Sequence, residues 1–278
     1  MSAAQLDERS VRRATEGLRL IGQAEALVEF HPVLESTNDR LQTLADEGAG
    51  EGTLVVAGRQ EQGRGRRGRA WSSPAGGLYL SLLLRPDDAM LRRLPVTLLG
   101  GLAAAEAIEA ACGLRPELKW PNDVMLGGRK VAGILGELAR DGAGQRLVLG
   151  VGMNVTTREG DLPTELHEVA TSLAIEQGAG GPLTEAPAEE ALETVLRGFL
   201  ARFEEHYLAV RRGGGATILS VAWSRMPHLG KPIRVRMGGE VITGIASGLN
   251  ATGGLVLERE NGQRQVIVAG EVEEVRPK

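Results

Sequence analysis

The feature that most limits how this chain can fold is a loop rich in arginine and glycine between two apolar segments. Five arginines and one glutamate occupy the eleven residues from Arg59 to Arg69. The flanking residues 53–57 (TLVVA) and 78–84 (LYLSLLL) favour buried β-strands. We therefore predict two strands joined by a mobile, cationic loop.

The glycines of this loop match a dinucleotide-binding pattern only in spacing. Gly63, Gly65 and Gly68 spell GxGxxG, but AWSSPAGG follows them where that fingerprint requires a helix. No GxxxxGK[ST] motif is present, since Gly230-Lys231 runs into proline. If the chain handles phosphates, it uses arginine and lysine side chains together with glycine backbone amides.

An arginine-rich loop is also typical of RNA-binding segments, and this alternative stays open. Two observations count against it. A disordered basic segment would not lie between two buried strands, and stacking aromatic residues are almost absent from the loop.

The composition of the chain excludes several other classes of protein. The 278 residues carry a formal charge of -4, with 24% charged and 42% hydrophobic residues, which fits a folded protein and not a basic nucleic-acid coat. Cys112 is the only cysteine and no His/Cys ligand cluster is present, so we predict no disulfide and no metal site. Without a signal sequence or a long apolar run, we expect a cytoplasmic protein that does not enter a membrane.

The spacing of hydrophobic residues along the chain predicts where its helices and strands lie. We expect helices at residues 8–29, 39–47, 94–111 and 187–209, a short extended piece at 31–34, and further strands at 118–119, 124–126, 131–138 and 147–155. The fold class is therefore α+β, with a mixed, mainly antiparallel sheet packed with helices.

From about residue 229 the pattern changes to short strands separated by frequent turn signals, which is typical of a small β-barrel. We place a domain boundary near residue 226. This gives a domain at residues 1–226, which begins with a helical segment at 1–28, and a second domain at 227–278.

A second polar group lies in KWPND and the segment that follows it. If the chain turns back at Gly127-Gly128, then Asn122, Asp123 and Lys130 meet at one end of a hairpin. A lysine beside a carboxylate suits anion binding or proton transfer. The ordinary alternative is a lysine that faces solvent.

A third segment, GVGMN, places Gly150 and Gly152 inside a strand just before Asn154. Glycine within a strand often marks the close approach of a ligand or of another backbone.

These segments together resemble the biotin protein ligases. The motifs are ESTN (35–38), QGRGRRGRAW (62–71), KWPND (119–123), RKVAGILGE (129–137) and GVGMN (150–154), in the order and spacing of that family. The resemblance extends from about residue 30 to the end of the chain. It implies a catalytic domain like that of class II aminoacyl-tRNA synthetases and an SH3-like C-terminal barrel.

The resemblance implies a two-step reaction. The carboxylate of biotin attacks the α-phosphate of ATP, with Mg²⁺ accompanying the ATP, to give biotinyl-5'-AMP and pyrophosphate. A lysine of a biotin carboxyl carrier protein then accepts the biotinyl group. Stabilising charge at the α-phosphate suits an arginine-lined loop, and the reactive anhydride must be shielded from water.

The resemblance also implies roles for individual residues. Lys130, Arg66 and Asp123 are the expected catalytic residues. Lys130 would bridge the biotin carboxylate and the α-phosphate, and Asp123 would position metal or accept a proton. The expected biotin contacts are Ser36, Thr37, Asn38, Gln60, Gly63, Arg64, Gly65, Arg66, Lys130, Gly133, Gly150 and Gly152. The expected ATP and adenylate contacts are Arg66, Arg69, Trp71, Lys119, Asn122, Lys130 and Asn154.

Two departures from the family pattern stand out. Glu61 adds a negative charge where the family more often has a small or amide residue. Only 35 residues precede Ser36, too few for the winged helix-turn-helix domain of some members, so we expect a monofunctional ligase that binds no DNA. The related lipoate and octanoate transferases are the second enzymatic alternative. The arginine loop and the C-terminal barrel argue against them.

Overall fold

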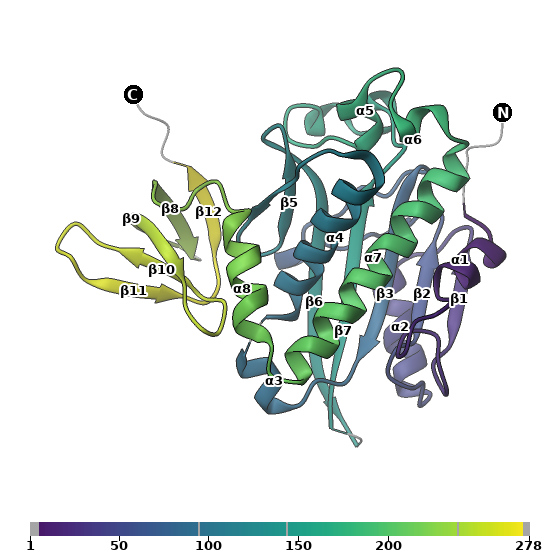
Figure 1. Ribbon diagram of the computed structural model, residues 1–278, viewed down its shortest axis with the longest axis horizontal. Coiled ribbons are helices and arrows are strands. Elements are labelled where there is room, and N and C mark those ends of the chain that lie inside the picture. The colour runs from purple at the N-terminus through teal and green to yellow at the C-terminus, as the bar shows by residue number, and fades with distance from the viewer. Residues whose placement is uncertain (1–5, 94, 143, 238, 275–278) are drawn as a thin grey trace.

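A seven-stranded sheet forms the centre of the larger part of the molecule, in a computed structural model that describes residues 6–93, 95–142, 144–237 and 239–274 (Figure 1). In spatial order its strands are β1 (Val28–His31), β2 (Leu54–Ala57), β3 (Gly77–Leu84), β7 (Gly144–Asn154), β6 (Arg129–Asp141), β5 (Asp123–Leu126) and β4 (Glu117–Lys119). Only β1 and β2 are parallel, and every other neighbouring pair in this order is antiparallel. The prediction of a mixed, mainly antiparallel sheet is confirmed.

Both faces of the central strands are covered, which explains why residues 78–84 read as a continuous apolar run. Leu80 and Leu82 belong to the core beneath α4 (Val96–Cys112) and α7 (Ala188–Arg211), which lie on one face (Figure 1). Leu83 points to the other face, where it packs with α2 (Thr37–Asp46). The functional residues described below lie on the α2 face.

The helix predicted over residues 94–111 begins at Val96, after Pro95, and Leu94 lies outside the described residues. It ends as expected before Gly113, whose φ of 71° is the left-handed conformation that glycine adopts readily at a helix end. The remaining helices are α1 (Glu8–Ala14), α3 (Asp88–Arg93), α5 (Leu173–Gln177), α6 (Pro182–Glu185) and α8 (Gly215–Ser224). No helix in the described ranges is long and apolar enough to cross a membrane.

The helix predicted over residues 8–29 is wrong beyond Ala14. The chain leaves the helix at Thr15, turns at Gly17 and Gly22 with φ of 80° and 70°, and joins the sheet as β1. Backbone N–H groups that would otherwise form helical bonds donate instead to the buried carboxylate of Glu204 on α7. The donors are those of Arg19, Leu20 and Ile21, at 2.7 to 3.0 Å.

The C-terminal region is a five-stranded antiparallel sheet, hereafter the C-terminal sheet (Figure 1). Its strands in spatial order are β11 (Arg264–Ile267), β10 (Leu255–Glu258), β9 (Glu240–Leu249), β8 (Pro232–Met237) and β12 (Glu271–Glu274). It contacts the larger part of the molecule through the buried Trp120, whose indole N–H donates to Gly253 O at 3.1 Å.

Candidate active site

The floor of the site is a stretch of strand backbone without side chains. Gly133 on β6 pairs with Gly152 on β7, and Gly150 pairs with Leu135. We call Gly133, Gly150 and Gly152 the glycine track. A Cβ atom at Gly150 would collide with Asn38 Oδ1, and one at Gly152 would collide with the indole of Trp71. The bare backbone therefore lets other groups lie directly against the sheet.

One wall is the first turn of α2, where the ESTN motif places three buried polar side chains. Ser36 is the N-cap and accepts from Asp39 N at 3.4 Å. Thr37 donates through its backbone N–H and its hydroxyl to Gln60 Oε1, at 2.8 and 3.0 Å. The Ser81 hydroxyl lies 2.6 Å from Asn38 Oδ1. This wall presents fixed amide and hydroxyl groups to the pocket.

The opposite wall is the arginine loop, which forms a small hairpin at residues 63–71. Trp71 N donates to Gly63 O at 2.8 Å, and Gly65 N donates to Arg69 O at 2.7 Å. A 3-10 turn at Arg66–Gly68 forms the tip, where Arg67 and Gly68 have positive φ. The sequence predicts a mobile loop here, whereas its backbone bonds give it a defined shape, hereafter the arginine hairpin.

Three parts of the molecule hold the side chains of the arginine hairpin: α2, the seven-stranded sheet with the turn between β4 and β5, and the C-terminal sheet. Arg64 lies 2.8 Å from Asp39 on α2 and 2.7 Å from Glu137 on β6. Arg66 donates to Asn122 Oδ1 at 3.0 Å. The hairpin is thus tied to a helix and to the edge of the sheet.

The third tie comes from the C-terminal sheet. Glu271 on β12 forms ion pairs with Arg69 and, at 3.4 Å, with Arg67. The hydrogen bond from Arg69 is the main cause of the lowered pKa of the Glu271 carboxyl. Burial, followed by the nearby charge of Arg67, lowers the pKa of Arg66. Cationic side chains are therefore crowded at this end of the pocket.

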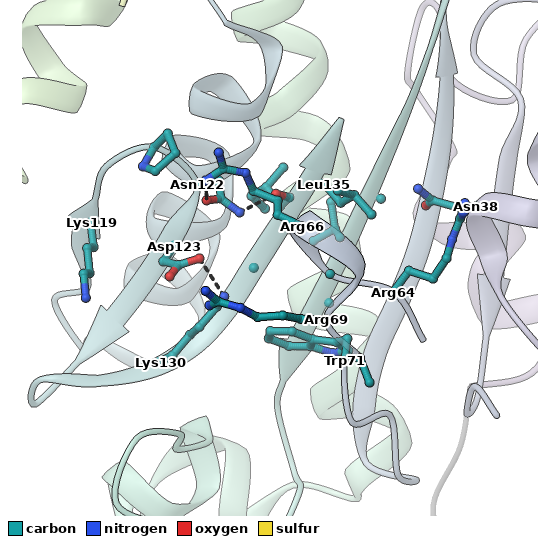
Figure 2. Close-up of a pocket in the computed structure, with 18 of the residues that line it drawn as sticks. Asn38, Arg64, Arg66, Arg69, Trp71, Lys119, Asn122, Asp123, Lys130 and Leu135 are labelled. Atoms are coloured by element: carbon teal, nitrogen blue, oxygen red, sulfur yellow. Dashed lines mark hydrogen bonds and ion pairs between the residues drawn. The ribbon is translucent and has the colours of Figure 1, made fainter. Parts of the chain in front are cut away.

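Lys130 lies at the centre of the cationic end. Its Nζ is 2.6 Å from Asp123 Oδ1 and 5.1 Å from the centroid of the Trp71 ring. Figure 2 shows Asp123, Lys130, Arg69 and Trp71 grouped together, with Lys119 farther out beyond Asp123. The turn at Gly127 and Gly128 returns the chain so that β5 and β6 bring Asp123 and Lys130 to one site.

These elements enclose a pocket of about 260 Å³. Of the expected site residues, it is lined by Ser36, Thr37, Asn38, Gln60, Arg64, Gly65, Arg66, Arg69, Trp71, Lys119, Asn122, Asp123, Lys130, Gly133, Gly150 and Gly152. Asn38 and Arg64 lie at one end and the Lys130 group at the other (Figure 2). The pocket therefore has a polar end, where the charge of Arg64 is paired with Asp39 and Glu137, a bare floor and a cationic end, which suits a flat polar molecule with an anionic tail.

Two expected residues are absent from the lining. Gly63 lies at the base of the arginine hairpin, where a Cβ would collide with the Trp71 carbonyl. Asn154 ends β7 and donates to Thr171 O at 2.8 Å. The buried Asn154 Oδ1 and Trp71 Nε1 have no hydrogen-bond partner among the described residues.

Sequence reasoning missed one wall of the pocket, which Glu271, Val272 and Glu273 of β12 supply. No local pattern in β12 distinguishes it from the other strands, so only the docking of the C-terminal sheet could reveal this role. Trp120 and Pro121 also line the pocket. Their place within the KWPND motif is a signal that could have found them.

The carboxylates of the pocket are the candidate ligands for a metal ion. Within the described part of the chain, no group of three or more His, Cys, Asp or Glu side chains is arranged to hold a metal ion. Magnesium that accompanies ATP is held mainly by phosphate oxygens and water, with one or two carboxylates. Asp123, Glu271 and Glu273 line the pocket and fit that limited requirement.

Comparisons with known proteins agree with this geometry. Residues 30–154 match the model of the Biotin/lipoate A/B protein ligase family, and residues 228–273 match the Biotin protein ligase C terminal domain. The Bifunctional ligase/repressor BirA of Bacillus subtilis is 36% identical over 242 residues, covering 86% of this chain and 72% of the relative. The Biotin--[acetyl-CoA-carboxylase] ligase of Mycobacterium tuberculosis is 33% identical over 280 residues, covering 98% and 96%.

A solved structure is also similar. The biotin protein ligase of Aquifex aeolicus in complex with biotin and ATP superposes with a TM-score of 0.71 at 32% identity, covering 89% of this chain and 97% of that one. The chain belongs to the Biotin/lipoate A/B protein ligase family and, within it, to the biotin protein ligases.

Proposed function

We propose that this chain activates biotin with ATP to form biotinyl-5'-AMP and pyrophosphate, and then transfers biotin to a lysine of a biotin carboxyl carrier protein. The observation that carries the proposal is the pocket itself. Its polar amide and hydroxyl end, its bare floor and its cationic end match the ureido ring, the flat body and the carboxylate tail of biotin.

Biotin would lie along the glycine track. The hydroxyl and amide groups of Ser36, Thr37, Asn38 and Gln60 would hydrogen-bond its ureido ring, because these side chains are already fixed around one end of the pocket. A site built from buried polar groups rejects molecules that leave those groups unpaired. The apolar dithiolane ring of lipoate would leave them unpaired.

Lys130 would bridge the biotin carboxylate and the α-phosphate of ATP. A carboxylate oxygen attacks the phosphorus, the bond to the bridging oxygen breaks, and pyrophosphate leaves. Lys130, Arg66 and Arg69 would stabilise the negative charge of this step from one end of the pocket. Lys119 and Asn122 would contact the nucleotide beside them.

The adenylate would lie against Trp71. The ring of Trp71, with Lys130 Nζ 5.1 Å from its centroid, and the adjacent Arg66 and Arg69 support a nucleotide at this position. Magnesium would enter with the ATP phosphates and neutralise part of their charge. The hairpin would exclude water, which protects the mixed anhydride from hydrolysis.

In the second step the ε-amine of the carrier lysine attacks the acyl carbon and AMP leaves. Asp123 would accept the proton that this amine loses. We propose that both steps occur in the cytoplasm. We also propose a domain boundary near residue 226, which the match at residues 228–273 supports.

The test is biotin-dependent exchange of labelled pyrophosphate into ATP by the whole chain, followed by mass spectrometry of a carrier domain. We expect exchange with biotin and a carrier mass increased by one biotinyl group. Exchange that requires lipoate would instead assign the chain to lipoate activation. Salt-dependent RNA binding in a filter assay, without exchange, would favour the RNA-binding alternative.

A further inference from the structure

Glu137 lies on β6 just outside the pocket and gathers three side-chain donors on one oxygen. Its Oε2 accepts from Asn38 Nδ2 at 2.6 Å, from Arg64 Nη2 at 2.7 Å and from Gln42 Nε2 at 3.2 Å. Asn38 and Gln42 are one helical turn apart on α2, whereas Arg64 belongs to the arginine hairpin. One carboxylate therefore joins the two walls of the pocket.

Strand register explains this position. Side chains two residues apart on a strand share a face, so Glu137 follows Leu135 and Gly133 on the α2 face of β6. Gly133 and Leu135 line the pocket, and Glu137 does not. It pairs with Val148, which packs beneath α2. Glu137 thus acts on the pocket through its neighbours.

The carboxylate determines which way the Asn38 amide points. A carboxylate oxygen only accepts hydrogen bonds, so the amide group on Glu137 must be the Asn38 NH₂. The carbonyl oxygen Oδ1 then accepts from Ser81 and lies over Gly150, at the polar end of the pocket. In this orientation Asn38 offers an acceptor to an N–H donor that lies on the glycine track.

We propose that Glu137 is a positioning residue for the ureido group of biotin, which rests on the function proposed above. It holds the Asn38 carbonyl toward a ureido N–H and clamps Arg64 so that the arginine hairpin stays closed over that ring. It contributes to biotin affinity and to retention of the adenylate, and it does not touch the reacting atoms.

The first test compares Glu137→Gln with the wild type and with Glu61→Gln. Glu61 is a matched control because its carboxylate is exposed and pairs with Arg59 at 3.2 Å on the same loop. For Glu137→Gln we expect the KM for biotin to rise at least tenfold while the KM for ATP changes less than threefold. Glu61→Gln should leave both values unchanged.

A second test shows whether the effect passes through Asn38. Glu137→Gln should cause a fold-increase in the KM for biotin that is at least three times smaller in an Asn38→Ala background than in the wild type. The reason is that substitutions of residues that act as a unit are not additive. Thermal melting of each variant reports folding separately. If Glu137→Gln raises both KM values equally, or changes only the melting temperature, the positioning role is wrong.

The two proposals fail in different ways. A wild-type chain without biotin-dependent exchange overturns the proposed function. An active wild type whose Glu137→Gln variant behaves like Glu61→Gln overturns only the positioning role.

Discussion

The ammonium group of Lys130 lies 2.6 Å from a carboxylate oxygen of Asp123. Each group extends from a neighbouring strand, so the pair holds a positive charge at a fixed height above the glycine track. A ligand anion entering the pocket would meet a lysine that is already oriented, and would leave Asp123 beside the reaction centre.

Replacing Lys130 by alanine should reduce adenylate formation about 10²–10³-fold, because one preorganised charge is lost from the α-phosphate. Labelled pyrophosphate exchange measures this rate. The fold should persist, since a side chain at the pocket edge leaves little cavity. Lys231→Ala, at an exposed lysine just before β8, is the control and should behave as wild type. Near-normal exchange by Lys130→Ala would remove Lys130 from the mechanism.

Replacing Arg66 by alanine should weaken retention of the adenylate. The hydrogen bond of Arg66 to Asn122 holds the hairpin tip against the sheet edge, and without it the tip is held only through Arg67 and Arg69 to Glu271 among the contacts described above. Released biotinyl-AMP would then acylate lysines of a bystander protein such as serum albumin, detected with streptavidin. Arg59→Ala, whose guanidinium pairs only with Glu61 among the ion pairs of the described residues, should give no excess labelling. Equal labelling by both variants would contradict the prediction.

Replacing Gly152 by alanine should block the floor of the pocket, because the new Cβ overlaps the place of the Trp71 indole. We expect loss of biotin binding by calorimetry and a decrease of about 1–3 kcal/mol in the free energy of unfolding, as for other overpacked sites. Gly142→Ala is the matched control, since its Cβ meets nothing within 4 Å. Unchanged biotin affinity in Gly152→Ala would place the ligand elsewhere.

Glu271→Gln should remove a pH-dependent contribution to stability. The folded pKa of Glu271 lies below the ordinary value near ~4.3, mainly because Arg69 donates to it. The contribution is therefore complete above that ordinary value and disappears as the pH falls through the lowered one. Urea unfolding at pH 7 should show the wild type more stable than the variant, and the difference should shrink as the pH is lowered below that ordinary value. A constant difference across this range would exclude the carboxylate as its source.

The sequence predicts those parts of the fold whose signal is local. Residues 53–57 and 78–84 form strands because their apolar content needs no tertiary information, and Gly113 ends α4 through its own backbone preference. Residues 15–27 depart from the predicted helix, and the N–H groups of Arg19, Leu20 and Ile21 donate to Glu204, far along the chain. The helix α8 also went unpredicted, since it begins in a run of glycines and its buried Ile218 and Ala222 give only a weak pattern.

The residues of the candidate site also divide into those with a local signal in the sequence and those without one. Residues in motifs reach the pocket because the sheet order places β6 and β7 side by side, beneath the start of α2 and the loop that follows β2. Glu271 has no such local signal, and its place depends on how β12 pairs with β8. The clamp by Glu137 likewise depends on the register between β6 and β7.

The glycine track limits how the pocket can be redesigned. A floor of backbone offers no side chain that can be shortened to make room for a larger substrate, and every substitution there only fills space. Protein engineers who want this scaffold to accept bulkier analogues would have to vary the first turn of α2 and the arginine hairpin instead. Directed-evolution libraries should therefore hold Gly133, Gly150 and Gly152 constant.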